Sequence, residues 1–196
     1  MKKARLITTG FTIVELLIVI VVIAILAAIS IVAYNGIQQR SQNSQTQAVV
    51  KSYYKALTAY AIDNGSYPIQ TTTWCLGEGY SCASIGSPNA TANNLLRPYM
   101  NNANPLPAPS DKQVTYYGTR TGAAYSYMSS ASLDGNPYPW GISYVLQGDV
   151  SCGLDNVAGT SPNWPNFTRA ANTTGATERA FGNVYCRLIL PDPTSL

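Results

Sequence analysis

The sequence has 196 residues, a length that suits one domain of ordinary size or one domain with an appendage. Charged residues make up only 11% of the chain and apolar residues 46%, a composition that excludes a charge-rich disordered protein. The chain contains no histidine, which excludes Ser-His-Asp and Cys-His catalytic arrangements and histidine-ligated zinc. We expect a protein that is not an enzyme and that needs no metal and no cofactor.

The first feature in chain order is an apolar run from Phe11 to Tyr34. Before its last residue it contains three polar residues: Thr12, Glu15 and Ser30. As a helix the run would be roughly 36 Å long, enough to cross a hydrocarbon core of about 30 Å. A single segment in a membrane has to be helical, because all its backbone polar groups must be bonded within the segment. The sequence predicts a transmembrane helix over residues 11–34.

The ten residues ahead of this run carry three basic residues: Lys2, Lys3 and Arg5. By the positive-inside rule they hold this end in the cytoplasm and direct the rest of the chain outside. Two simple alternatives are a secretory signal peptide cut near Ala27-Ala28 and a plain membrane anchor. The run is longer than a typical signal core. Neither alternative explains Glu15, because a carboxylate inside a membrane is costly and usually functional.

Gly10, Phe11 and Glu15 stand at a fixed spacing between the basic leader and the apolar run. This arrangement, Gly10-Phe-Thr-Ile-Val-Glu-Leu-Leu, resembles the processing and assembly motif of type IV pilins and the related pseudopilins. The resemblance implies that a prepilin peptidase cuts after Gly10 and methylates the new amino-terminal Phe11. It also implies that Glu15 pairs with the amino terminus of an adjacent subunit during filament assembly.

Removal of the leader peptide, residues 1–10, would also remove three of the twelve basic residues. The mature chain would then carry as many basic as acidic residues. The net charge of +3 is therefore an orientation signal, and nucleic acid is not indicated as a partner.

Residues 35–64 are predicted to continue the helix in amphipathic form. An apolar stripe at helical spacing marks the face on which a globular head would pack: Val49, Tyr53, Ala56, Leu57 and Tyr60. The helix should end at Asp63-Asn64-Gly65, where Gly or Asn suits a left-handed cap. The stretch from Tyr60 to Pro68 also resembles the end of the long helix in pilins and pseudopilins.

Residues 65–196 are predicted to form an extracellular head. We expect a connecting region over 69–113, with one short helix near Ala92–Met100, and then a sheet and C-terminal disulfide region over 114–190. The strand candidates are Val114–Tyr117, Ala123–Met128, Ile142–Leu146 and Asn183–Leu190, the first two forming a hairpin. The predicted fold class is α+β: a long N-terminal helix, transmembrane in its first half, packed against a small antiparallel sheet that disulfides staple.

Four cysteines allow three pairings, and their even number suits an oxidising compartment. We favour Cys75–Cys82, which closes a short loop, and Cys152–Cys186. The second pair resembles the C-terminal disulfide-bounded region of many pilins. Neither pair has the tight Cys-x-x-Cys spacing of a zinc site.

The family resemblance implies a structural subunit of a type IV pilus filament. Its partners would be copies of itself, prepilin peptidase, an assembly platform in the inner membrane, and lipid before assembly. The chain would first be a single-pass precursor in the cytoplasmic membrane and then part of an extracellular filament. Two alternatives share the amino-terminal features: a pseudopilin of a type II secretion or DNA-uptake machine, and a minor tip pilin that acts as an adhesin or DNA receptor.

Overall fold

The computed structural model describes the chain in segments: residues 11–69, 72–78, 82, 87–115, 119–127, 132–133, 136–137, 140–148, 150–154, 157–158, 178–180 and 182–195. The predicted leader, with Gly10, lies outside the described residues. The chain divides into two compact units at Gln38 and Gln39, and each unit is described by itself below.

Helix α1 spans Ile13–Asn64 and continues through Gly36 without a break. The predicted end is confirmed: Gly65 follows with a left-handed φ of 70°, which is costly for any residue with a Cβ. The Asn64 side chain donates a hydrogen bond of 2.8 Å to the carbonyl of Tyr60, one turn earlier, and so adds a contact within the last turn of the helix.

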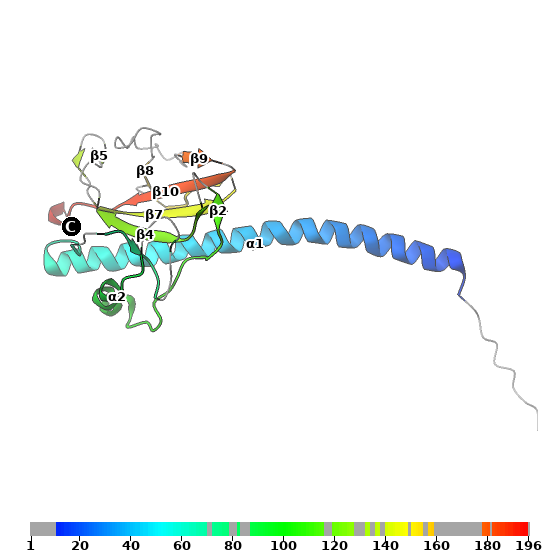
Figure 1. Cartoon of the computed structure of the whole chain (residues 1–196), viewed down its shortest axis with the longest axis horizontal. Helices are drawn as coiled ribbons and strands as arrows, with labels where there is room; N and C mark the ends of the chain where they lie inside the picture. The colour runs from blue at the N-terminus through cyan, green and yellow to red at the C-terminus, as the bar shows by residue number, and fades with distance from the viewer. Residues whose placement is uncertain are drawn as a thin grey trace, which may run out of the picture. The chain divides into compact units, whose positions relative to one another are not determined.

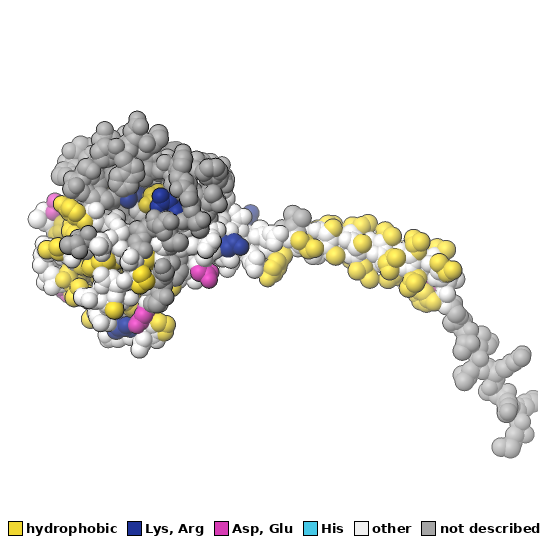
Figure 2. Space-filling view, in the orientation of Figure 1, with side chains coloured by type: hydrophobic (Ala, Val, Ile, Leu, Met, Phe, Trp, Pro, Cys, Tyr) yellow, Lys and Arg dark blue, Asp and Glu magenta, His cyan; other side chains and the backbone are white. Residues whose placement is uncertain are grey.

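In the N-terminal unit, the face of α1 that Figure 2 shows is covered with apolar side chains. The large apolar side chains from Phe11 to Ile37 that the structure describes are 46–84% exposed, so no other part of the described chain covers them. By length and composition this is the one helix among the described residues that could cross a membrane. Its polar Ser30 is satisfied internally, because its hydroxyl donates a 2.7 Å hydrogen bond to the carbonyl of Leu26.

The second unit contains a six-stranded antiparallel sheet (Figure 1). Its path is β1-β4-β7-β10-β8, and β9 also pairs with β10. The strands of this sheet are β1 Trp74–Cys75, β4 Ala123–Tyr127, β7 Trp140–Gln147, β8 Val157–Ala158, β9 Glu178–Ala180 and β10 Asn183–Ile189. Two short two-stranded pairs lie apart from it: β2 Val114–Thr115 with β3 Thr119–Arg120, and β5 Ser132–Leu133 with β6 Asn136–Pro137.

The core of this unit lies between the sheet and the C-terminal half of α1. The predicted apolar stripe on the helix is buried at Val49, Tyr53, Ala56 and Leu57, while Tyr60 is half-buried. The facing side chains come from β4, β7 and β10 and include Tyr125, Ile142, Tyr144, Leu146 and Val184. Burial of a Leu or Val side chain contributes roughly 1.5–3 kcal/mol, so this stripe stabilises the contact of helix and sheet.

The connecting region contains the predicted short helix. It is made of α2, Ala90–Leu96, followed by a 3₁₀ turn η1 at Arg97–Met100. The side chain of Asn89 caps α2 by accepting a 3.0 Å hydrogen bond from the Ala92 N–H. A last 3₁₀ turn, η2, covers Pro193–Ser195.

The predicted hairpin between residues 114–117 and 123–128 is wrong. Strand β2 pairs with β3 instead, and β4 lies between β1 and β7. The physical reason is that both hydrogen-bonding edges of β4 are occupied by other strands, and Ala123 to Ser126 are all buried. A strand buried on both faces belongs inside a sheet, and the turn signal at Gly118 to Gly122 did not reveal this.

Candidate functional site

The start of α1 is organised by a reciprocal pair of contacts between Thr12 and Glu15. The carboxylate oxygen Oε2 of Glu15 accepts hydrogen bonds from the backbone N–H of Thr12 at 2.9 Å and from its hydroxyl at 2.7 Å. The Thr12 hydroxyl in turn accepts a 3.2 Å bond from the backbone N–H of Glu15. This is a capping box, in which two backbone donors at a helix start are satisfied by side chains three residues apart.

This capping box explains how an acidic residue is accommodated next to an apolar helix. The positive end of the helix dipole favours a carboxylate in the first turn, and Thr12 supplies two hydrogen-bond donors. Sequence reasoning singled out Glu15 but missed Thr12, although the spacing Thr-x-x-Glu is itself the signal for a capping box. Phe11 comes directly before this box and is 74% exposed.

The described head contains two disulfides. Cys75–Cys82 has its Cα atoms 5.4 Å apart, and Cys152–Cys186 has them 5.8 Å apart. All four residues are buried. These are the two pairings that the sequence analysis favoured.

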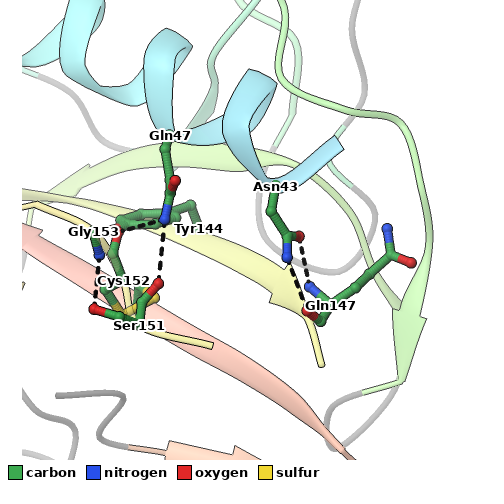
Figure 3. Close-up of a disulfide and its surroundings, with 8 residues drawn as sticks. Asn43, Gln47, Tyr144, Gln147, Ser151, Cys152 and Gly153 are labelled. Atoms are coloured by element: carbon green, nitrogen blue, oxygen red, sulfur yellow. Dashed lines mark hydrogen bonds between the residues drawn. A yellow bond between two sulfur atoms is a disulfide. The ribbon is translucent and has the colours of Figure 1, made fainter. Parts of the chain in front are cut away.

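Amide side chains of α1 hold the segment that leads from β7 to Cys152 (Figure 3). The Asn43 side chain donates to the carbonyl of Gln147 and accepts from its N–H, both at 2.9 Å. One helical turn further, Nε2 of Gln47 donates to the carbonyls of Ser151 at 3.2 Å and Cys152 at 3.1 Å. Asn43 therefore satisfies the backbone of the last residue of β7, and Gln47 binds backbone carbonyls beyond the end of that strand.

Gly153 shows how closely this segment approaches α1. Its φ is +70°, and an added Cβ would come within 2.5 Å of Nε2 of Gln47. A side chain at this position would therefore be strained and would also displace the amide of Gln47.

A second polar cluster, centred on Glu78 and Arg97, links three parts of the connecting region by hydrogen bonds. Arg97 donates to Oε2 of Glu78 at 2.8 Å and also to the carbonyl of Ala103. The backbone N–H of Leu106 donates to the same Glu78 oxygen at 3.1 Å. Arg97 first, and then Leu106, hold the pKa of the Glu78 carboxyl below its ordinary value.

Comparison with known proteins gives matches by sequence alone, since no family model and no solved structure matches the chain. The chain is 28% identical to the fimbrial protein EcpC of Eikenella corrodens over 137 residues, which are 66% of this chain and 87% of EcpC. It is 36% identical over 64 residues to a fimbrial protein of Neisseria meningitidis serogroup A and to the type IV major pilin protein PilE1 of Neisseria gonorrhoeae. These last matches cover 33% of this chain and less than half of each Neisseria protein, 38% and 39%.

The described structure combines an exposed apolar helix with an α+β head that two disulfides staple. The chain is thus similar, at modest identity, to a fimbrial protein and to a type IV major pilin. The relatives are named as structural pilins, not as enzymes.

Proposed function

We propose that this chain is made as a membrane precursor, is cut after Gly10 and methylated on Phe11, and becomes a structural subunit of a type IV pilus. The observation that carries this proposal is the apolar surface of α1 from Phe11 to Tyr34, which no other described part of the chain covers. Such a surface needs either lipid or other helices around it. Lipid surrounds it before assembly, and the helices of neighbouring copies replace the lipid in the filament.

Glu15 has a separate role in this proposal. Cutting before Phe11 creates a positively charged amine within one helical turn of this carboxylate. In the single chain, Thr12 supplies donors to Glu15. In an assembled bundle, a carboxylate among apolar side chains strongly favours the axial position at which it meets the amino terminus of a neighbour, because an unpaired charge there is costly. Glu15 thus sets the register between subunits.

The partners that follow are a prepilin peptidase, which processes the leader, and an assembly platform in the cytoplasmic membrane. The mature subunit leaves the membrane and becomes part of a filament on the cell surface. Its two disulfides suit this location, because disulfides persist in oxidising compartments outside the cytoplasm.

The replacement Glu15→Gln tests this role with the cap preserved. A glutamine oxygen can still accept from Thr12, so the capping box remains, while the charge is lost. We expect the variant to reach mature size in the membrane fraction but to be strongly depleted from filaments sheared off the cells. Ser30→Ala, which removes a polar group bonded only within its own helix, serves as the matched control and should assemble normally.

Filaments of Glu15→Gln at the wild-type level would contradict the charge-pairing role. The wild-type amount in the sheared fraction also separates the proposed function from its alternatives. An abundant mature chain supports a major subunit, while a processed chain that is scarce in sheared filaments would favour a pseudopilin or a minor tip pilin.

A further inference from the structure

The carbonyl of Cys152 is held from two sides by groups outside its own loop. Gln47 on α1 donates to it at 3.1 Å, and the hydroxyl of Tyr144 on β7 donates to it at 2.9 Å. Figure 3 shows both side chains directed at this carbonyl. Neither contact involves a sulfur atom, so neither needs the disulfide in order to form.

Tyr144 also defines where Cys186 lies. In the antiparallel register of β7 and β10, Tyr144 is the direct partner of Cys186. The residue that binds the Cys152 carbonyl is therefore opposite the other cysteine of the pair. Upstream, the two bonds between Asn43 and Gln147 fix the beginning of the segment that carries Cys152.

The other two cysteines lie on a different part of the sheet. Cys75 is on β1, which pairs with β4, and the Cys82 N–H donates to the Cys75 sulfur at 2.8 Å. Strands β4 and β7 lie between β1 and β10, so Cys75 and Cys186 are about 14 Å apart at the usual strand spacing. A disulfide requires Cα atoms within about 7 Å, so the folded sheet does not permit a bond between these two cysteines.

We propose that Gln47 and Tyr144 place Cys152 against Cys186 before their bond forms, and so select this pairing from the three that four cysteines allow. In the step itself, the two thiols lose two protons and two electrons to a small-molecule or protein disulfide outside the cytoplasm. That oxidant is reduced to two thiols. This positioning of Cys152 takes place while the head folds, and it does not depend on filament assembly.

The first test measures whether Cys152 is held when no bond can form. Cys186→Ser leaves Cys152 as a thiol, and the rate at which iodoacetamide alkylates it is measured by peptide mass spectrometry on the full chain in detergent micelles. We expect alkylation at least about tenfold slower than in urea. When Gln47→Ala and Tyr144→Phe are added to Cys186→Ser, the alkylation rate of Cys152 should rise at least about fivefold. The loss of even one hydrogen bond changes an equilibrium by roughly that factor.

The matched control in this background is Gln45→Ala. Gln45 is on the same helix but donates to the carbonyl of Ala108, away from the cysteine loop, so the rate should not change. The proposal is overturned if Cys152 in Cys186→Ser reacts as fast as in urea, or if the added pair of changes leaves the rate as it was.

The second test follows the pairing itself. The reduced full chain is refolded in detergent with glutathione disulfide, and the bonds formed early are mapped. We expect Cys152–Cys186 to dominate in the wild type and cross-paired products to increase severalfold in Gln47→Ala with Tyr144→Phe. Leu57→Ala, which lowers stability but removes neither hydrogen bond to the Cys152 carbonyl, should pair as the wild type does. The proposal would be overturned if Leu57→Ala gave as much cross-paired product as the double variant. It would also be overturned if the double variant gave no more cross-paired product than the wild type.

Discussion

Asn43 on α1 and Gln147 at the end of β7 exchange two hydrogen bonds of 2.9 Å, one in each direction, across 104 positions of sequence. Strand β4 pairs with β7 only as far as Tyr144, so the Asn43 side chain satisfies the edge of β7 that β4 leaves open at Gln147, while Asn183 of β10 lies opposite Gln147 on the other edge. Asn43 is buried, so its loss would leave both backbone groups of Gln147 without these partners in a place that water reaches poorly.

Asn43→Ala should lower the free energy of unfolding by about 1–3 kcal/mol, the cost of leaving buried polar groups unsatisfied. The measurement is urea unfolding of the full chain in detergent, followed by tryptophan fluorescence. Ser44→Ala, at the exposed neighbouring position, is the control and should stay within about 0.5 kcal/mol of the wild type. Equal effects of the two changes would contradict the structural role of Asn43.

The stripe on α1 gives a second matched comparison. Leu57 is fully buried against the sheet, while Ile62 on the same helix is 60% exposed. Leu57→Ala should cost about 2–5 kcal/mol, through lost burial and the cavity left behind, and Ile62→Ala should cost about 0.5 kcal/mol or less. A thermal or urea unfolding series measures both, and similar losses at the two positions would show that this face of the helix does not pack on the head.

The Glu78–Arg97 pair predicts a dependence on acid pH. Because the pKa of Glu78 is lower in the folded than in the unfolded chain, its contribution to stability is present above the unfolded pKa and is lost as pH falls toward the folded one. The melting temperature of Glu78→Gln should therefore lie below that of the wild type at pH 7, and the gap should close as pH falls below about 4.

Asp111→Asn is the control for this series, since Asp111 is exposed on a different loop. A gap between wild type and Glu78→Gln that stays constant from pH 7 to pH 3 would mean that the Glu78 charge does not stabilise the connecting region.

The buried tyrosines predict the behaviour at alkaline pH. Burial raises the pKa of Tyr53 to about 12, and it also raises the pKa of Tyr67, Tyr125 and Tyr144. Ordinary tyrosines ionise near about pH 10. Absorbance at 295 nm should thus rise in two phases, and stability should be retained up to about pH 10 and then fall as these hydroxyls are forced to ionise. A single phase that accounts for all fourteen tyrosines near pH 10 would contradict their burial.

The N-terminal features could be predicted from sequence because their signals are local. A long apolar run, a helix end at Gly65 and a stripe at helical spacing each depend on neighbouring residues, and α1 confirms all three. The capping box of Thr12 and Glu15 is equally local and could have been found by its spacing.

The sheet was less predictable because strand pairing is decided by distant residues. A turn-like sequence between two short apolar runs suggested a hairpin, yet β4 bonds to β1 and β7 on either side. Strands of two or three residues, such as β1 and β8, carry no period that a sequence pattern can detect. The roles of Asn43 and Gln47 could not be predicted either, because the sequence around an amide side chain on a helix does not indicate which distant backbone group it will bind.

The most direct test of the central claim is the intact mass of the protein recovered from filaments sheared off native cells, with sequencing of its N-terminal peptide. The account predicts an abundant chain that begins at Phe11 with a methylated amino group and contains two disulfides. Replacing Gly10 with leucine should leave the leader attached and remove the protein from the filament fraction. A chain that still begins at Met1, or one that is cut near Ala28 and absent from filaments, would contradict the account and favour a plain membrane anchor or a secreted domain.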